Sequence, residues 1–357
     1  MQPINEKTKG EVLFITGAAG YIGAMLADQF SKRQDVSSIV ALDKEEMPEL
    51  LLKNSKVVYL KKNLGEDSWE NEVAAHKPTV VIHCAWQIRE LYGKKDIQWK
   101  WNVTGSEKVF DFSFKTPSVK KLIYFSTVAS YGAYPENEIE RRFTENDPFR
   151  ITDYLYAEEK RIVEERLLEK YSRAKSAGKA PQVFIVRPAA ITGPRGRFMR
   201  VRFGLQSALS GQLRESLSHR IVSALVSFVP VTKKWCRQFI HEDDVNDIVE
   251  LLAFGKLHGE YEIFNICPPG PVVTGVDMAG AVGKRAVRVP PMLIRIAFFF
   301  AWHLSRGKIP TSRGGWKSYS YPIAVDGSRI TKKYGYKYRV ESKDAFVKKE
   351  GRYARYV

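Results

Sequence analysis

Short apolar runs alternate with longer stretches of helical spacing over the first half of the chain. Strands are predicted at 12–16, 38–42, 56–60, 79–85, 120–126 and 182–187, and helices at 20–31, 67–76, 97–114 and 153–176. Runs rich in Val, Ile and Leu are typical of parallel strands that are buried on both faces. The alternation therefore predicts an α/β fold with a doubly wound parallel sheet, which binds its ligand at the carboxyl ends of the strands.

The regular alternation ends after Pro188. Helices are expected near 199–210, 212–228 and 243–254, and strands near 237–241 and 261–266. We therefore expect a core domain over 10–190 and a smaller, interleaved lobe over 191–357. Residues 237–266 would contribute to both, so the boundary between the two is soft.

A glycine-rich turn separates the first predicted strand from the first helix. Gly17, Gly20 and Gly23 occur in the stretch Gly-Ala-Ala-Gly-Tyr-Ile-Gly. Glycines allow backbone N–H groups to approach a pyrophosphate, and the start of the helix adds partial positive charge. The simpler interpretation is a tight turn without a ligand. The flanking strand and helix favour a dinucleotide site.

The second strand ends at Asp43, 20 residues after Gly23. A carboxylate at this place hydrogen-bonds the adenosine ribose and repels a 2′-phosphate. The sequence therefore favours NAD over NADP. Lys44 follows immediately and leaves NADP possible.

Composition is typical of an ordered globular protein, with 44% hydrophobic and 27% charged residues among 357. Three cysteines, Cys84, Cys236 and Cys267, lack the spacing of a metal site, so no metal is expected. Their odd number favours a reducing compartment, and the polar N-terminus shows no signal peptide. No apolar run reaches the length of a membrane span. We therefore expect a cytoplasmic protein.

The net charge of +17 is concentrated in the second half of the chain. Residues 187–237 carry a net +9 and residues 302–357 a net +10, which leaves the remainder slightly negative. Such a field attracts a phosphorylated substrate, an anionic membrane or nucleic acid. The plainer interpretation is a solvated basic surface.

Candidate acid/base chemistry lies in the helix predicted at 153–176. Tyr156 and Lys160 are four residues apart and share one helix face. A nearby ammonium would lower the pKa of the phenol, which could then exchange a proton with a substrate hydroxyl. Ser126 and Thr127 cap the carboxyl end of the strand at 120–126 and could hold the substrate oxygen. Taken alone, each pattern also fits ordinary surface side chains.

Taken in order, these pieces resemble the extended short-chain dehydrogenase/reductases, also called the NAD-dependent epimerase/dehydratase family. Further matching pieces are His83-Cys84-Ala85, Asn102-Val103-Thr104-Gly105, Arg187-Pro188 and Phe239-Ile240-His241-Glu242-Asp243-Asp244-Val245. Asn63-Leu64 departs mildly from the pattern, since this family usually has Asp where Asn63 stands. The resemblance covers roughly residues 10–270.

The resemblance implies a Rossmann domain over 10–190 and hydride transfer between nicotinamide and a secondary alcohol or ketone. Tyr156, Lys160 and Thr127 would be catalytic, with Tyr156 moving the hydroxyl proton. Cofactor contacts would come from residues in the glycine turn and at the strand ends: Gly17, Ala19, Gly20, Tyr21, Ile22, Gly23, Asp43, Asn63, Leu64, Cys84, Ala85, Asn102, Ser126, Tyr156, Lys160 and Pro188. Substrate contacts would come from Trp86, Thr127, Arg195 and Arg197.

Variable positions narrow the substrate class. Val128 and Ala129 follow Thr127 where 4,6-dehydratases carry acidic residues, which argues against dehydration. Ala190 stands where sugar-nucleotide epimerases place an Asn on the substrate diphosphate. The leading hypothesis is therefore a hydroxysteroid-dehydrogenase-like oxidoreductase, and the alternative is an NAD-dependent sugar-nucleotide epimerase. The arginines at 195, 197, 200 and 202 keep a phosphorylated sugar open.

The apolar segment at 290–304 has three interpretations: a helix in a membrane interface, a cap over an apolar pocket, or a core helix. A non-catalytic dinucleotide-binding protein is a third functional hypothesis, against which the Tyr156/Lys160 pair argues. Nucleic acid is an improbable partner because no aromatic-basic module is visible. By family analogy, the helices at 97–114 and 153–176 could form a homodimer.

Overall fold

The computed structural model describes residues 10–196, 228–281 and 283–356. Its centre is a seven-stranded sheet in the order β11-β6-β5-β4-β1-β2-β3, in which every neighbouring pair is parallel. The strands are β1 (Glu11–Thr16), β2 (Val36–Asp43), β3 (Val57–Lys61), β4 (Val80–His83), β5 (Lys121–Phe125), β6 (Gln182–Pro188) and β11 (Tyr261–Ile266).

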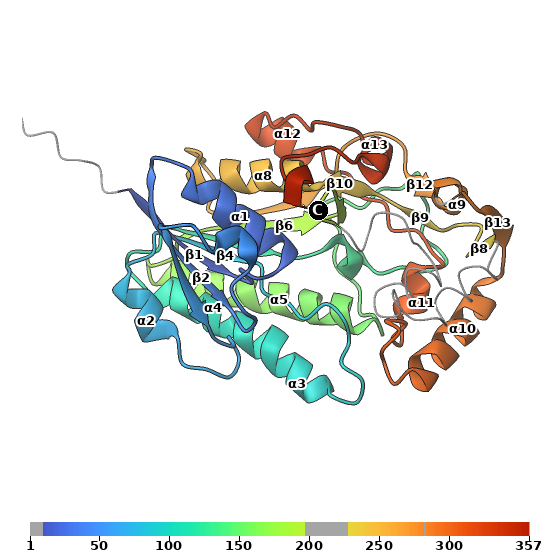
Figure 1. The fold of residues 1–357 in the computed structure, drawn as a ribbon, viewed down its shortest axis with the longest axis horizontal. Helices are drawn as coiled ribbons and strands as arrows, with labels where there is room; N and C mark the ends of the chain where they lie inside the picture. The colour runs from blue at the N-terminus through green and yellow to red at the C-terminus, as the bar shows by residue number, and fades with distance from the viewer. Residues whose placement is uncertain (1–9, 197–227, 282, 357) are drawn as a thin grey trace, which may run out of the picture.

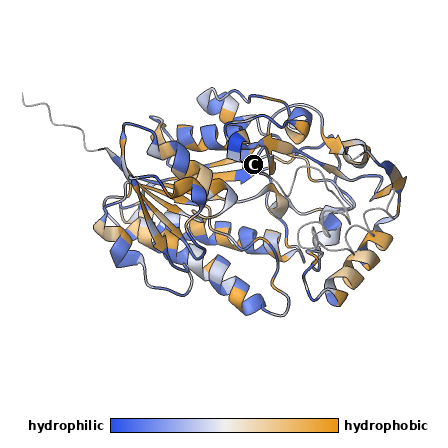
Figure 2. Ribbon diagram, viewed as in Figure 1, coloured by the Kyte–Doolittle hydropathy of each residue, from blue (hydrophilic) through white to orange (hydrophobic). Residues whose placement is uncertain are grey.

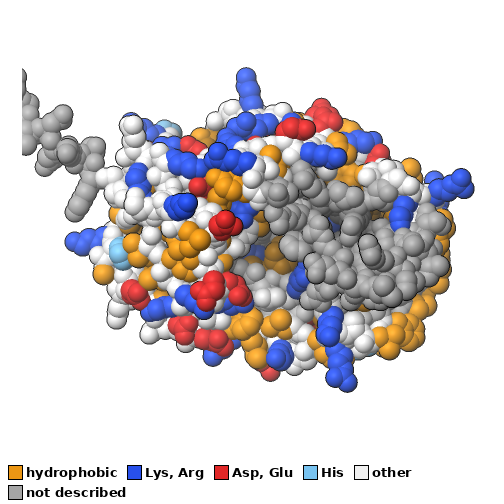
Figure 3. Space-filling model, in the orientation of Figure 1, with side chains coloured by type: hydrophobic (Ala, Val, Ile, Leu, Met, Phe, Trp, Pro, Cys, Tyr) orange, Lys and Arg blue, Asp and Glu red, His pale blue; other side chains and the backbone are white. Residues whose placement is uncertain are grey.

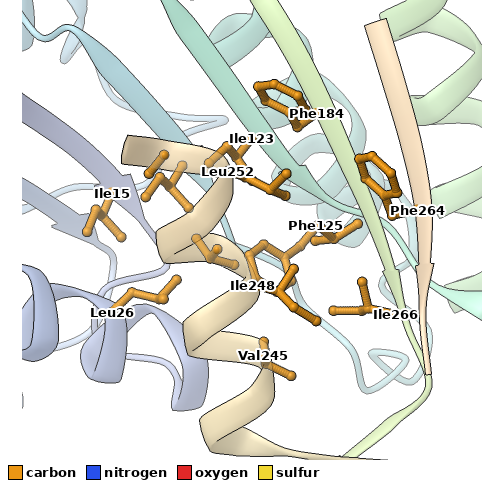
Figure 4. Close-up of a cluster of buried hydrophobic side chains, with 14 of the residues drawn as sticks. Ile15, Leu26, Ile123, Phe125, Phe184, Val245, Ile248, Leu252, Phe264 and Ile266 are labelled. Carbon is orange, nitrogen blue, oxygen red and sulfur yellow. The ribbon is translucent and has the colours of Figure 1, made fainter. Parts of the chain in front are cut away.

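Helices cover both faces of this sheet (Figure 1). α1 (Tyr21–Ser31) and α8 (Glu242–Phe254) pack on one face, where Leu26, Ile248 and Leu252 join a buried cluster with Ile15. Figure 4 shows the labelled side chains of α8 directed toward those of the strands. On the other face lie α2 (Glu70–Ala75), α4 (Gly105–Lys115) and α5 (Leu155–Ser176). The doubly wound parallel sheet is confirmed.

In the described part of the smaller lobe there are three short two-stranded sheets and several helices. Its strands are β7 (Ala190–Thr192), β8 (Phe228–Val231), β9 (Cys236–Arg237), β10 (Phe239–His241), β12 (Val273–Thr274) and β13 (Arg285–Arg288). Its helices are α9 (Gly275–Ala281), α10 (Pro291–Leu304), α11 (Gly315–Ser318), α12 (Arg329–Tyr334) and α13 (Ser342–Val347). β11 belongs to the central sheet, and the division of the chain into the two expected domains stays a prediction.

Two predicted elements differ from the structure. The strand at 237–241 is interrupted at Gln238, whose amide side chain bonds the backbone of Val325, so β9 and β10 pair with different strands. The helix at 97–114 is α3 (Lys95–Trp99) and α4 joined by a π-helical segment, Lys100–Thr104. The helices expected at 199–210 and 212–228 lie outside the described residues, apart from Phe228, which begins β8.

Candidate active site

The glycine turn follows β1 at the centre of the sheet. Gly17 has a φ of +73°, and a Cβ on it would lie 2.6 Å from the backbone nitrogen of Ala85. A Cβ on Gly23 would lie 2.2 Å from the carbonyl oxygen of Gly17. Only glycine fits these two positions without a backbone shift. The turn therefore brings the start of α1 close to the end of β4, where a diphosphate can meet the first N–H groups of the helix.

Asp43, at the end of β2, lies against this turn. Its carboxylate accepts a hydrogen bond from the Ala19 N–H at 3.0 Å and another from the Glu45 N–H at 3.0 Å. Asn63 and Leu64 follow β3 and serve the local structure. The Asn63 side chain accepts from Gly65 N–H, and Leu64 is buried in the core. Their contact with a cofactor stays a prediction, as does that of the partly buried Ile22.

The opposite wall of the crevice is the segment after β4. The N–H of Cys84 donates to the Thr16 carbonyl at 3.2 Å, which holds this segment against β1. Burial raises the pKa of the Cys84 thiol, so Cys84 is a packing residue rather than a nucleophile. Trp86 follows, with its indole N–H buried and without a hydrogen-bond partner among the described residues.

Tyr156 and Thr127 are brought together from α5 and the end of β5. The Thr127 hydroxyl hydrogen-bonds the Tyr156 side chain, and it also accepts from the Ala129 N–H at 3.1 Å. Burial raises the pKa of the Tyr156 phenol, and the bond to Thr127 lowers it by less. The phenol, beside the Thr127 hydroxyl, is placed to exchange a proton with a substrate oxygen.

Lys160 lies on the same helix as Tyr156. Its ammonium donates to the Phe125 carbonyl oxygen and lies 3.7 Å from the ring centroid of Trp86. Burial and Thr127 account for the shift in the pKa of Tyr156, and the expectation that Lys160 lowers that pKa stays a prediction. Burial lowers the pKa of Lys160 itself to about 7. The shared helix face was predicted correctly, but the side chain turns toward β5 and Trp86.

Asn102 has a structural role. Its side chain accepts from the Gln87 N–H at 2.7 Å, donates to the Gln87 carbonyl at 3.0 Å, and donates to the Glu159 carboxylate at 2.7 Å. It thus ties the loop that carries Trp86 to the residue beside Lys160. Ser126 has a buried hydroxyl without a partner among the described residues, and Pro188 ends β6. For both, a role at the cofactor stays a prediction.

A contact that the sequence did not suggest closes the other side of the glycine turn. The Tyr21 phenol donates to the carboxylate of Glu242, the first residue of α8, and the Arg195 N–H donates to the same carboxylate at 3.2 Å. The Arg195 guanidinium lies 6.0 Å from the ring of Tyr353. Arg195 is therefore near the turn, and its contact with substrate stays a prediction. Arg197 lies outside the described residues.

Aromatic residues surround Tyr156 on the lobe side. The rings of Tyr154 and Tyr156 lie 5.8 Å apart, and Tyr319 and Arg237 both influence the pKa of Tyr154, which burial raises most. Arg237 lies 5.4 Å from the ring centroid of Tyr319 and makes no ion pair with any described residue. Sequence reasoning missed Arg237. Its position two residues before Phe239, where a segment that matches the family begins, could have indicated it.

The residues present fit a dinucleotide. The turn excludes Cβ atoms where a diphosphate would lie, a carboxylate lies where the ribose would be, and the hydroxyl of Ser126 has no partner among the described residues. Residues 13–267 match the NAD dependent epimerase/dehydratase family. The chain belongs to this family. It is an enzyme, and NAD is its cofactor. Across the described residues, no group of three His, Cys, Asp or Glu side chains could hold a metal ion.

One curated relative is the decarboxylating sterol-4-alpha-carboxylate 3-dehydrogenase of Saccharomyces cerevisiae. The two sequences are 29% identical over 198 residues, which make up 53% of the present chain and 54% of the yeast protein. The match therefore spans about half the length of the relative.

Solved structures share the fold over nearly the whole chain. WbmG from Bordetella bronchiseptica, in complex with NAD and UDP, has a TM-score of 0.66 at 19% identity, over 96% of this chain and 94% of that one. UDP-glucose 4-epimerase from Thermotoga maritima, with UDP-glucose, has a TM-score of 0.66 at 19% identity, over 94% and 96%. At this identity, the likeness shows that the chain shares the fold of these proteins.

Proposed function

We propose that this enzyme oxidises and re-reduces a carbinol carbon of a sugar nucleotide, as an epimerase does. Bound NAD supplies the hydride acceptor and, once reduced, the donor. Tyr156 takes the proton of the substrate hydroxyl and returns it, while the Thr127 hydroxyl positions the same oxygen. The buried ammonium of Lys160 borders this site and can hold the nicotinamide ribose. The family membership and the solved relatives that carry UDP or UDP-glucose support this proposal.

The observation that carries the substrate class is Arg237. It is a cation on the lobe side of Tyr154, held between the rings of Trp235 and Tyr319, at 5.7 and 5.4 Å from their centroids, rather than by a carboxylate of the described chain. A guanidinium fixed in this way suits a diphosphate, which it can bind through two parallel hydrogen bonds. Arg237 thus compensates for Ala190, which cannot bind the diphosphate as an Asn would.

The test is incubation of purified protein with UDP-glucose, UDP-N-acetylglucosamine and dTDP-glucose separately, with chromatographic separation of the epimers. We expect interconversion without a net rise in absorbance at 340 nm. Tyr156→Phe should reduce turnover by roughly 10²–10⁴-fold while NAD binding is retained. Arg237→Met should raise KM by roughly tenfold or more. Lys332→Met, which removes an exposed cation on α12, is the control of equal charge and should leave KM unchanged.

A second candidate is net dehydrogenation of an apolar secondary alcohol. The aromatic wall of Trp86, Tyr154 and Tyr319 and the partial match to a sterol dehydrogenase favour it. A steady rise at 340 nm with a 3β-hydroxysterol, without interconversion of any sugar nucleotide, would replace the epimerase by this dehydrogenase. Near-normal turnover of Tyr156→Phe with every substrate would contradict both.

A further inference from the structure

Helix α10 is apolar around most of its circumference but is buried on one side only. Its buried residues are Ile294, Phe298 and Trp302, spaced four apart on one stripe. The remaining large apolar side chains face solvent: Met292, Leu293, Ile296, Phe299, Phe300 and Leu304, with Leu304 82% exposed and Phe299 58% exposed. A helix with this composition is normally buried all round, so the exposed side needs a partner.

α10 lies at one end of the lobe, where further apolar side chains are exposed. In Figure 2 the helix is hydrophobic along its length, at the end of the lobe farthest from β1 (Figure 1). Apolar side chains gather at that edge in Figure 3. Val287 on β13 and Phe228 on the paired β8 are also exposed. The buried stripe fixes the orientation of the helix. The ring centroids of Phe298 and Tyr319 lie 5.2 Å apart, and those of Trp302 and Tyr92 lie 5.4 Å apart.

The charge around α10 identifies the partner. Between Asp277 and Asp326 the chain has eight Lys or Arg residues and no Asp or Glu. Arg285 and Arg288 precede the helix, and Arg306 and Lys308 follow it; all four are exposed and form no ion pair with a described residue. An apolar, Phe-rich face flanked by unpaired cations fits an anionic lipid surface, where the apolar groups enter the acyl region and the cations meet the headgroups.

We propose that the exposed face of α10, flanked by these cations, docks the enzyme on an anionic membrane. With 14 residues the helix is about 21 Å long, so it lies in the interface rather than across the bilayer. None of the described helices is long and apolar enough to cross a membrane. This docking is independent of the proposed reaction, because no residue of the docking face belongs to the catalytic site.

The test is co-sedimentation of the full chain with two kinds of vesicle, phosphatidylcholine alone and phosphatidylcholine with phosphatidylglycerol in equal parts. We expect binding to the mixed vesicles to be at least roughly tenfold tighter than to the neutral ones and to weaken as salt is added. Phe299→Ser/Phe300→Ser should lose at least roughly tenfold in affinity, and Arg285→Gln/Arg288→Gln should lose the preference for the anionic lipid.

Leu52→Ser/Leu168→Ser is the matched control. It removes two exposed apolar side chains of the core domain, 62% and 49% exposed, and it should bind vesicles as the parent does. NAD binding by each variant shows that it is folded. Equal binding to both kinds of vesicle, or unchanged binding by the Phe variant, overturns the proposal. The proposal is also overturned if size-exclusion chromatography shows that the parent is a dimer and the Phe variant a monomer, because a second copy of the chain would then cover this face.

Discussion

Individual residues of the site differ in what their surroundings allow. The Gly17 and Gly23 positions exclude any side chain, because the added atom would meet backbone rather than a flexible side chain. The Lys160 ammonium donates to the Phe125 carbonyl oxygen, but its burial removes water from the charge and lowers its pKa. The first constraint is steric and independent of pH, whereas the second is electrostatic and changes with pH. The effect of substituting a glycine should therefore not depend on pH, whereas the effect of substituting Lys160 should.

Gly23→Ala should destabilise the fold by about 1–3 kcal/mol and weaken NAD binding by at least roughly tenfold, because the carbonyl of Gly17 must move away from the new Cβ. Urea unfolding and titration with NAD measure the two effects. Gly280→Ala is the control, since a Cβ on this exposed residue of α9 meets nothing within 4 Å. It should stabilise the protein by up to about 1 kcal/mol. Equal behaviour of the two variants would show that the turn is not constrained.

Lys160→Met should stabilise the protein most at neutral pH. The pKa of Lys160 is about 7 in the folded state and about 10.4 in the unfolded chain. Between these values the unfolded state holds the extra proton, so the parent gains stability as pH rises, by up to about 1.4 kcal/mol per pH unit. The Met variant lacks this gain. Its advantage in the free energy of unfolding should therefore shrink from about pH 7 to about pH 10.

Urea unfolding of the parent and the Met variant over this range measures that difference. Lys179→Met removes an exposed lysine and should show a difference that does not change with pH. A constant difference for Lys160→Met as well would mean that the ammonium is not desolvated.

At the scale of elements, the sequence predicted the main strands and helices because their hydrophobic periods are unambiguous. β1, β5 and β6 are continuous apolar runs, and α5 has a clear helical spacing. The π-helical segment around Asn102 was not predicted, since the five residues of Lys100–Thr104 are too few for the shift in helical phase to stand out from an ordinary helix. The break at Gln238 depends on a bond to Val325, which is 87 residues away. Likewise, the direction of the Lys160 side chain is set by Phe125 and Trp86 rather than by its own helix.

Asn102→Ala should show how much the hydrogen bonds of the π-helical segment contribute to stability. Without the amide, the Glu159 carboxylate keeps only its bond from Gln98 at 3.1 Å. Burial already raises the pKa of Glu159, and losing the bond raises it further. We expect a cost of about 1–3 kcal/mol. The native state then binds more protons than the unfolded chain, so the cost should be larger under mildly basic than under mildly acidic conditions.

Urea unfolding in the two conditions checks this cost. Ser113→Ala, which removes a buried bond to the Val109 carbonyl on α4, is the control, and its cost should not depend on pH. An Asn102→Ala cost that is the same in both conditions would mean that Glu159 does not depend on the amide.

At the scale of the whole molecule, the cofactor core and the lobe are joined by the end of the chain as well as by the active site. The chain returns from the lobe to α1 near its C-terminus (Figure 1). Arg352 pairs with Asp247 of α8 at 2.5 Å, and Tyr353 is buried against α1, with its hydroxyl 2.9 Å from the Met25 carbonyl and 3.0 Å from the Asp28 carboxylate. These contacts tie the C-terminal end of the chain to the helices of the core, and the domain boundary expected from the sequence stays a prediction. The homodimer suggested by family analogy stays a prediction.

Tyr353→Ala should therefore destabilise the core and the lobe together. It removes a ring that is 3% exposed and leaves Asp28 with one bond fewer, at a cost of about 3 kcal/mol. Because Trp69 lies in the core and Trp235 in the lobe, tryptophan fluorescence and NAD binding should be lost in one urea transition, shifted to lower concentration. Tyr356→Ala, at a position that is 42% exposed, should shift it much less. If fluorescence changed in two steps, with NAD binding retained after the first, the lobe would be an independent unit and the C-terminal contact would not couple it to the core.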